Sequence, residues 1–135
     1  MPPSGSSTSA QPLHIGILEV QGAFLEHQVA VTRAAASLPA GVQVHVHEVR
    51  TAAHVTDMLD GLIIPGGEST TISIYIKRNK MGEVLREWIL REDHVTWGTC
   101  AGMILLAKVT DNQKQGGQTS VSAGSMVIIL LHMCL

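Results

Sequence analysis

The stretch Val95-Thr96-Trp97-Gly98-Thr99-Cys100-Ala101-Gly102-Met103 decides the fold that we expect of this chain. It begins as a strand-like run and continues into a helical pattern, so a cysteine lies at the turn between a strand and a helix. Glycines flank this turn, as a nucleophile elbow requires, because the turn is strained and the helix packs closely. The start of a helix also favours the thiolate form of a cysteine. The alternative is a buried structural cysteine on an ordinary turn.

Composition restricts the class of protein. The 135 residues, 45% hydrophobic and 15% charged, are enough for one globular domain. A net charge of −2 and only 3% aromatic residues argue against nucleic-acid binding. No apolar run reaches the roughly 18 residues of a membrane span. The two cysteines, Cys100 and Cys134, form neither a disulfide framework nor a CxxC metal pattern, so we expect a reducing, cytoplasmic location. Residues 1–12 are predicted to be a disordered tail.

Apolar runs and helical patterns alternate along the rest of the chain. Strands are predicted at 13–20, 42–49, 61–64 and 93–97, and helices at 24–38, 70–78 and 81–91, with a weak helix or irregular crossover at 51–60. This alternation indicates an α/β protein with a parallel sheet and right-handed crossovers. Ligands of such sheets bind beyond the carboxyl ends of the strands. We therefore expect Gln21, the loop Pro65–Ser69 and Cys100 to converge.

The loop Pro65-Gly66-Gly67-Glu68-Ser69 has a chemical use at such a strand end. Its two glycines allow the backbone to approach a ligand, and Glu68 suits the amino group of an amino-acid substrate. An amide of this loop and the amide of Ala101 would flank one oxyanion. The alternative is a Pro-Gly turn followed by a helix cap, for which Ser69 is the expected capping residue.

Two histidines, His45 and His47, are predicted to point to one face of their strand. A metal-binding pair is one interpretation, and a solvated strand face is favoured because no third ligand is evident.

Taken together, these stretches resemble class I glutamine amidotransferases, and within them most closely the family of glutaminase subunits of pyridoxal 5′-phosphate synthases. The similarity covers about Leu13 to Gln118. The residues that carry it are Ile15-Gly16-Ile17-Leu18, Gln21-Gly22-Ala23, Glu26-His27, Leu62 to Thr71, Trp97 to Gly102, and Gln113 to Gln118.

The resemblance implies a parallel-sheet, Rossmann-like fold and hydrolysis of L-glutamine to glutamate and ammonia. Cys100 would be the nucleophile, and the amides of Gly67 and Ala101 would form the oxyanion hole. Gly66, Gly67 and Glu68 would contact glutamine, and Gln21 would face the partner. Ammonia would pass to a separate synthase subunit that makes the vitamin B6 cofactor, whereas the glutaminase itself uses no cofactor and no metal.

The sequence also departs from the family pattern. Members of the family continue for several further strands, which supply a substrate-binding arginine and a His-x-Glu pair that completes a catalytic triad. His132 is not followed by such an acid, His94 is expected about 10 Å or more from the elbow, and His27 begins a helix expected to face the partner. We therefore expect a C-terminally truncated form, with the glutaminase domain at 13–118 and a divergent tail at 119–135.

Three hypotheses about function follow. The chain is an impaired glutaminase subunit, a non-catalytic isoform that only binds the synthase or glutamine, or another cysteine hydrolase. The loop Pro65 to Thr71 argues against the third hypothesis. The apolar segment Met126 to Leu131 would either add a strand to the sheet or remain exposed. Because the gain from burying its side chains and the cost of ordering them nearly cancel, we expect a poorly soluble or self-associating protein.

Overall fold

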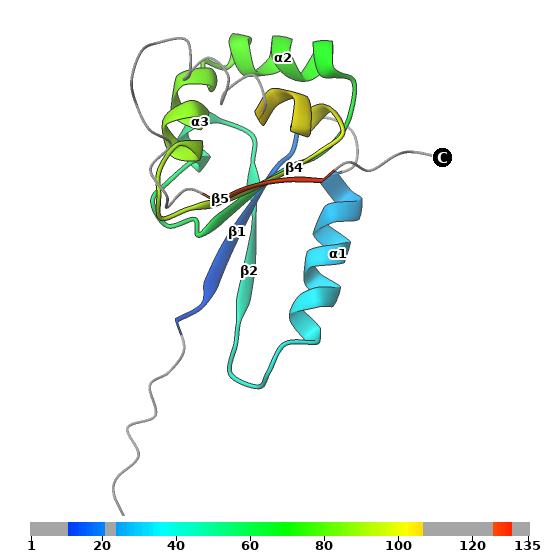
Figure 1. The fold of residues 1–135 in the computed structure, drawn as a ribbon, viewed down its shortest axis with the longest axis vertical. Helices are drawn as coiled ribbons and strands as arrows, with labels where there is room; N and C mark the ends of the chain where they lie inside the picture. Colours follow the sequence, from blue (N-terminus) through cyan, green and yellow to red (C-terminus); the bar gives the residue numbers. More distant parts are fainter. Residues whose placement is uncertain (1–10, 21–23, 107–125, 131–135) are drawn as a thin grey trace, which may run out of the picture.

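The protein is an α/β sandwich built on a parallel sheet, as the computed structural model in Figure 1 shows. The structure describes residues 11–20, 24–106 and 126–130. Gln21, Gln113 to Gln118, His132 and Cys134 lie outside these residues, as does nearly all of the predicted N-terminal tail. The elements are β1 (Leu13–Leu18), α1 (Phe24–Ala36), β2 (Val44–Val49), a 3₁₀ turn (Ala52–His54), β3 (Gly61–Ile64), α2 (Ser69–Arg78), α3 (Gly82–Ile89), β4 (Val95–Thr99), a helix over 101–106, and β5 (Met126–Leu130).

The sheet has the strand order β2-β1-β3-β4-β5, and every neighbouring pair is parallel. The order reverses between β1 and β3, which is the switch point where doubly wound sheets bind ligands. The loops that follow β1 and β3 both emerge there. The predicted α/β class and parallel sheet are therefore confirmed.

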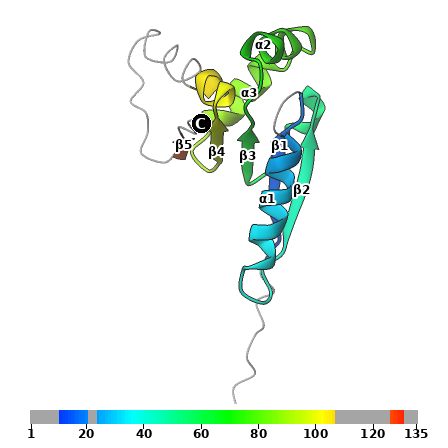
Figure 2. The same cartoon turned by 90° about the vertical axis from the view of Figure 1, so that its right-hand side faces the viewer.

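Helices cover the two faces of the sheet unequally, as Figure 2 shows. On one face, α2, α3 and the helix over 101–106 bury the main core. Its members are apolar side chains: Leu18, Val49, Leu59, Leu62, Ile64, Ile72, Ile76, Met81, Leu85, Trp88, Ile89, Ala101 and Leu106. On the other face, α1 lies in front of β1 and β2, while Val95 and Trp97 of β4 remain 41% and 37% exposed. The sheet is thus firmly packed on one side and partly open on the other.

Element ends differ from the predicted ones for identifiable reasons. The first helix stops at Ala36 because Ser37 and Leu38 donate hydrogen bonds to carbonyls three residues back, which tightens the last turn. The fourth strand begins at Val95 and not at residue 93, because His94 is buried against the ring of Trp88 before the ladder starts. The crossover at 51–60 is irregular apart from its 3₁₀ turn.

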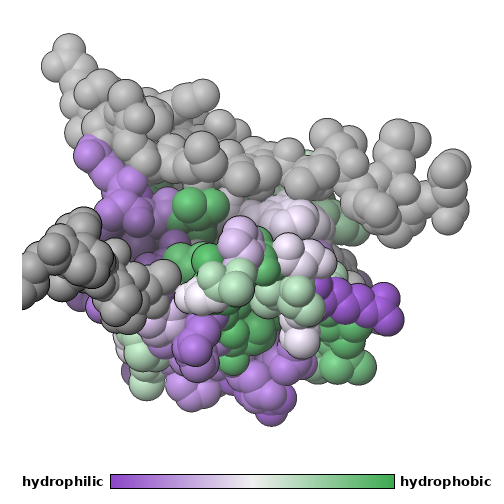
Figure 3. Space-filling model, turned by 90° about the horizontal axis from the view of Figure 1, so that it is seen from below, coloured by the Kyte–Doolittle hydropathy of each residue, from purple (hydrophilic) through white to green (hydrophobic). Residues whose placement is uncertain are grey.

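The segment Met126–Leu130 forms β5, which pairs with β4 in parallel from Val95↔Met126 to Thr99↔Leu130. The segment thus adds a strand to the sheet, and the expected self-association stays a prediction. Figure 3 views the end of the molecule where β1 begins, and there hydrophilic and hydrophobic residues are interspersed. No helix within the three described ranges has the length and apolar character that crossing a membrane requires.

Candidate active site

Cys100 lies on a strained turn between β4 and the helix over 101–106. Its φ angle is +52°, a left-handed conformation that costs a non-glycine residue about 1–2 kcal/mol. Its side chain is exposed, so the alternative of a buried structural cysteine is wrong. The strained backbone and the exposed thiol are the two features that the nucleophile-elbow interpretation requires.

Close packing explains the glycines on both sides of this turn. A methyl group on Gly102 would lie 2.0 Å from the carbonyl oxygen of Ile64, and one on Gly98 would lie 2.6 Å from Leu106. Such distances are far inside van der Waals contact, so only glycine lets the helix lie against β3 and β4. The sequence interpretation of these two positions is thus confirmed by the packing.

The loop after β3 lies directly against the cysteine. A Cβ atom built on Gly66 would stand 2.8 Å from the Cβ of Cys100 and 3.7 Å from its Sγ. The Gly66 N–H donates a hydrogen bond of 3.2 Å to the Thr99 hydroxyl, one residue before the cysteine. Gly67 follows in the exposed part of the same loop. The structure therefore brings the predicted loop and the predicted nucleophile together.

Glu68 is the N-cap of α2. Its carboxylate accepts hydrogen bonds from the amides of Thr70 and Thr71 and from the Thr71 hydroxyl. These bonds, the Thr71 hydroxyl first, lower the pKa of Glu68 to about 2, so the side chain is an anion at neutral pH. The expectation that Ser69 caps this helix is wrong, because Ser69 already lies inside the helix and the longer glutamate reaches its amides.

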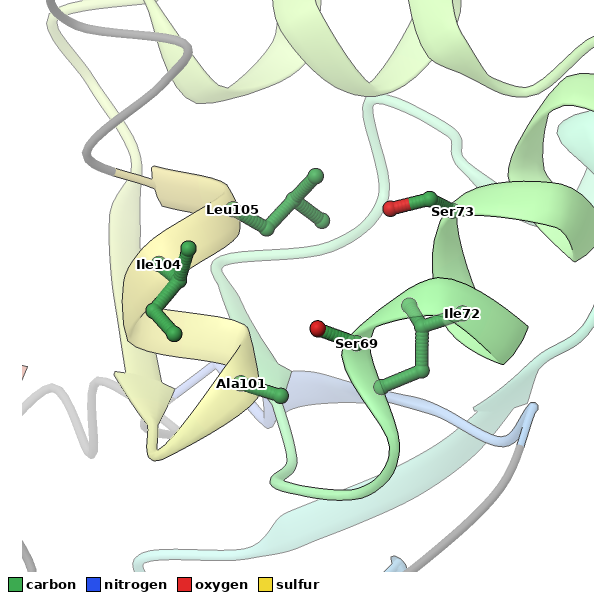
Figure 4. Close-up of a pocket in the computed structure, with 6 residues that line it drawn as sticks. All are labelled: Ser69, Ile72, Ser73, Ala101, Ile104 and Leu105. Carbon is green, nitrogen blue, oxygen red and sulfur yellow. The ribbon is translucent and has the colours of Figure 1, made fainter.

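Ala101, the second predicted oxyanion donor, is buried at the start of the helix that follows the elbow. It lines a crevice with Ser69 and Ile72 of α2, which Figure 4 shows between the two helices. The crevice has a volume of about 10 Å³, enough for no more than one water molecule. A ligand the size of an amino acid would therefore approach Cys100 from its exposed side and not through this crevice.

Two histidines are relevant to acid–base chemistry near the elbow. His27 of α1 lies with its Nε2 3.0 Å from the Thr99 hydroxyl, and its ring meets the ring of Trp97 edge to face at 6.3 Å. Burial lowers the pKa of His27, an effect that the charge of Glu26 partly opposes. His94 is stacked on Trp88 of α3 with ring centroids 4.0 Å apart.

The hydrogen bonds that join Thr99 to Gly66 and to His27 were not predicted from the sequence. The alternation of side chains along a strand is the feature of the sequence that could have predicted this contact. It places Trp97 and Thr99 on the same face of β4, which is the face that α1 covers. The His27 ring contacts the residue before the cysteine, and whether its helix also faces a partner stays a prediction.

The histidines of β2 form a cluster with a third histidine. His14 Nδ1 lies 2.8 Å from His47 Nε2, and the rings of His14 and His45 are stacked at 5.3 Å. Burial, followed by the charges of His14 and His45, lowers the pKa of His47. In the part of the chain that the structure describes, no three His, Cys, Asp or Glu side chains are arranged to hold a metal ion.

Comparison with known proteins identifies the family of this chain. The model of the SNO glutamine amidotransferase family matches residues 17–121. Pyridoxal 5′-phosphate synthase subunit SNO1 of Saccharomyces cerevisiae is 39% identical over 99 residues, which cover 73% of this chain and 44% of the relative. Subunit PdxT of Chloroflexus aurantiacus is 41% identical over 114 residues, 84% of this chain and 55% of the relative.

A solved structure agrees with these relatives. A crystal structure of a glutamine amidotransferase is 36% identical in sequence and superposes with a TM-score of 0.54. The match covers 67% of this chain and 43% of the chain in that crystal structure. The chain spans about half the length of the curated relatives it matches. The predicted resemblance is confirmed, and the chain belongs to the SNO glutamine amidotransferase family.

Proposed function

We propose that this chain supplies the nucleophile half of a glutaminase that releases ammonia from L-glutamine for pyridoxal 5′-phosphate synthesis. The observation that carries the proposal is the exposed Cys100, strained at φ +52° and in contact with the Gly66 loop. The names of the relatives, which are pyridoxal 5′-phosphate synthase subunits, support the assignment to vitamin B6 synthesis.

Each proposed role uses a feature of the described geometry. Cys100 Sγ attacks the side-chain amide carbon of glutamine, and the amides of Gly67 and Ala101 stabilise the oxyanion that forms. Gly66 and Gly67 lie along the substrate, with no side chain between the loop and the thiol. Glu68, kept ionised by its helix-cap bonds, attracts the ammonium group of glutamine.

The reaction then proceeds in two covalent steps. The tetrahedral intermediate collapses, its C–N bond breaks, and ammonia leaves with a proton that a general acid provides. The resulting glutamyl thioester on Cys100 is cleaved by water, which gives glutamate and restores the thiol. Both steps require a group that moves protons at the thiol and at the leaving nitrogen.

That requirement favours a second candidate function, binding without turnover. Among residues 11–20 and 24–106, the rings of His27 and His94 are hydrogen-bonded to Thr99 and to the Trp88 carbonyl, not to the thiol. A cysteine without a general base loses most of its turnover. This observation supports a chain that binds glutamine or the synthase but releases little ammonia.

One experiment separates these functions. The purified chain is treated with a glutamine-like diazo-ketone, the adduct is mapped, and ammonia release from glutamine is measured with and without a synthase subunit. Glutamine-protected labelling of Cys100 with steady ammonia release supports the glutaminase, and labelling without release supports the binding function. If Cys100 is not labelled, both proposals fail. Cys100→Ala is the control for each measurement.

The proposed partners are L-glutamine and a synthase subunit, with Gln21 on the surface that faces the synthase. We also propose a cytoplasmic location, because a nucleophilic thiol has to stay reduced to function.

A further inference from the structure

One hydroxyl group joins three elements of the candidate active site. Thr99 is the last residue of β4, and its Oγ1 accepts the Gly66 N–H from the loop after β3 at 3.2 Å. The same oxygen lies 3.0 Å from Nε2 of His27, in the first turn of α1. The hydroxyl therefore connects the β3 loop to α1 directly beside the elbow.

Both side chains of this contact are fixed by their surroundings. The branched Cβ of Thr99 restricts its rotation about χ1. His27 is half-buried, and its ring packs edge to face against Trp97, two residues earlier on the same strand. A hydroxyl has two acceptor positions and one proton, so it satisfies Gly66 and the imidazole at the same time.

The tethered residue packs against the nucleophile. A Cβ on Gly66 would be 2.8 Å from the Cβ of Cys100, so the N–H that Thr99 holds belongs to the backbone packed on the cysteine. Gly67, the proposed oxyanion donor, is the next residue. Any displacement of the Gly66 amide therefore moves the oxyanion donor relative to Cys100.

We infer that Thr99 and His27 are positioning residues, the hydroxyl of Thr99 holding the Gly66–Gly67 backbone against Cys100 and the ring of His27 orienting that hydroxyl. The structural part of this inference rests on the two hydrogen bonds, and its chemical consequence rests on the proposed glutaminase function. Neither residue touches the substrate in this role.

The test follows the Gly66 amide itself. In the ¹⁵N-labelled chain, Thr99→Val should raise the hydrogen-exchange rate of the Gly66 N–H about tenfold, the effect of losing one hydrogen bond, while the amides of β3 are unchanged. Thr99→Ser keeps the hydroxyl and should stay within about threefold of the parent. His27→Leu should also raise the exchange rate of the Gly66 N–H. His27→Gln places an amide near the position of Nε2 and should return that rate toward the parent value.

A second measurement reads the chemical consequence. Thr99→Val and His27→Leu should each slow labelling of Cys100 by a glutamine-like diazo-ketone about tenfold and leave the rate with iodoacetamide within about twofold, because only the former needs the positioned loop. The double variant should be no slower than Thr99→Val alone, since the two residues act in sequence.

The outcomes distinguish this inference from the proposed function. The inference is overturned if Thr99→Val folds and the hydrogen-exchange rate of the Gly66 N–H is unchanged. It is also overturned if that exchange rate rises while the rate of labelling by the diazo-ketone stays the same. Unchanged exchange in His27→Leu overturns the part assigned to His27, even if Thr99→Val does not fold. If the parent chain is not labelled, the proposed function fails, and the exchange rates still decide whether the tether exists.

Discussion

Gly66 lies against Cys100 so closely that a methyl group on the glycine would stand 2.8 Å from the cysteine Cβ. The contact explains why a glycine, and no larger residue, occupies this position of the loop. It also makes the position a sensitive test of the candidate site, because the backbone of Gly66 itself needs no unusual conformation.

Gly66→Ala should displace the loop from the cysteine. We expect labelling of Cys100 by a glutamine-like diazo-ketone to fall by about tenfold or more, and the free energy of unfolding to fall by about 1–3 kcal/mol from overpacking. Gly82→Ala is the matched control. Gly82 lies in the first turn of α3, and a Cβ atom there would be an ordinary 3.8 Å from its nearest neighbour, Ile76. Equal labelling of the two variants would contradict a substrate site at this loop.

The strain at Cys100 predicts a gain in stability when the cysteine is replaced by glycine. Glycine adopts a φ of +52° without penalty, although it has more entropy to lose on folding. We expect Cys100→Gly to be about 0.5–1 kcal/mol more stable than Cys100→Ala in urea denaturation.

Lys80 provides an internal reference for this measurement, because its φ of +53° is similar and it lies in the exposed turn before α3. Lys80→Gly should stabilise the protein relative to Lys80→Ala by a similar amount, and Cys100 should still be labelled. If Cys100→Gly is less stable than Cys100→Ala while Lys80→Gly behaves as expected, the elbow is not strained.

Local patterns in the sequence predicted the sheet and the elbow well. The apolar run 61–64 is β3, and the glycines around Cys100 are at the positions where two backbones approach. Such features are predictable because period, turn residues and glycine spacing are encoded within a few consecutive residues.

Contacts between distant segments were not predictable in the same way. The buried Glu19 pairs with Arg50 at 3.0 Å, and His27 reaches Thr99 across 72 positions. His14 joins His45 and His47 only because β1 and β2 pair in the register His14↔His45. Each of these contacts depends on strand order and register, which a linear pattern does not contain.

The helix cap made by Glu68 predicts a dependence of stability on acid. Its pKa is about 2 in the folded protein and 4.5 ordinarily, so its contribution is complete above pH 4.5 and disappears as the pH falls toward 2. Glu68→Gln should be less stable than the parent at pH 7, and the difference should shrink between pH 5 and pH 2.

Glu83→Gln is the matched control for this measurement, because Glu83 also lies in the first turn of a helix. Thermal unfolding at several pH values gives the comparison. If Glu68→Gln and Glu83→Gln have the same pH profile, the bonds from Thr70 and Thr71 do not hold the Glu68 carboxylate in solution.

The histidine cluster at the start of β1 and β2 predicts a second, milder pH dependence. Burial and the neighbouring His14 and His45 lower the pKa of His47 below 6.5, so the unfolded chain binds a proton there more readily than the folded protein does. The stability of the folded protein should therefore decrease as the pH falls from above 6.5 through the lowered pKa of His47.

His47→Gln removes this titration and should flatten the decrease in unfolding free energy between pH 7.5 and pH 5.5. Some decrease should remain, because burial also lowers the pKa of His27. His54→Gln serves as the control, since His54 is exposed in the 3₁₀ turn and outside the cluster. In an NMR titration, the pKa of the His47 ring should lie below the ordinary value of 6.5. If the pKa of the His47 ring is not below 6.5 and His47→Gln leaves the pH profile unchanged, then the 2.8 Å contact between His14 and His47 does not persist in solution.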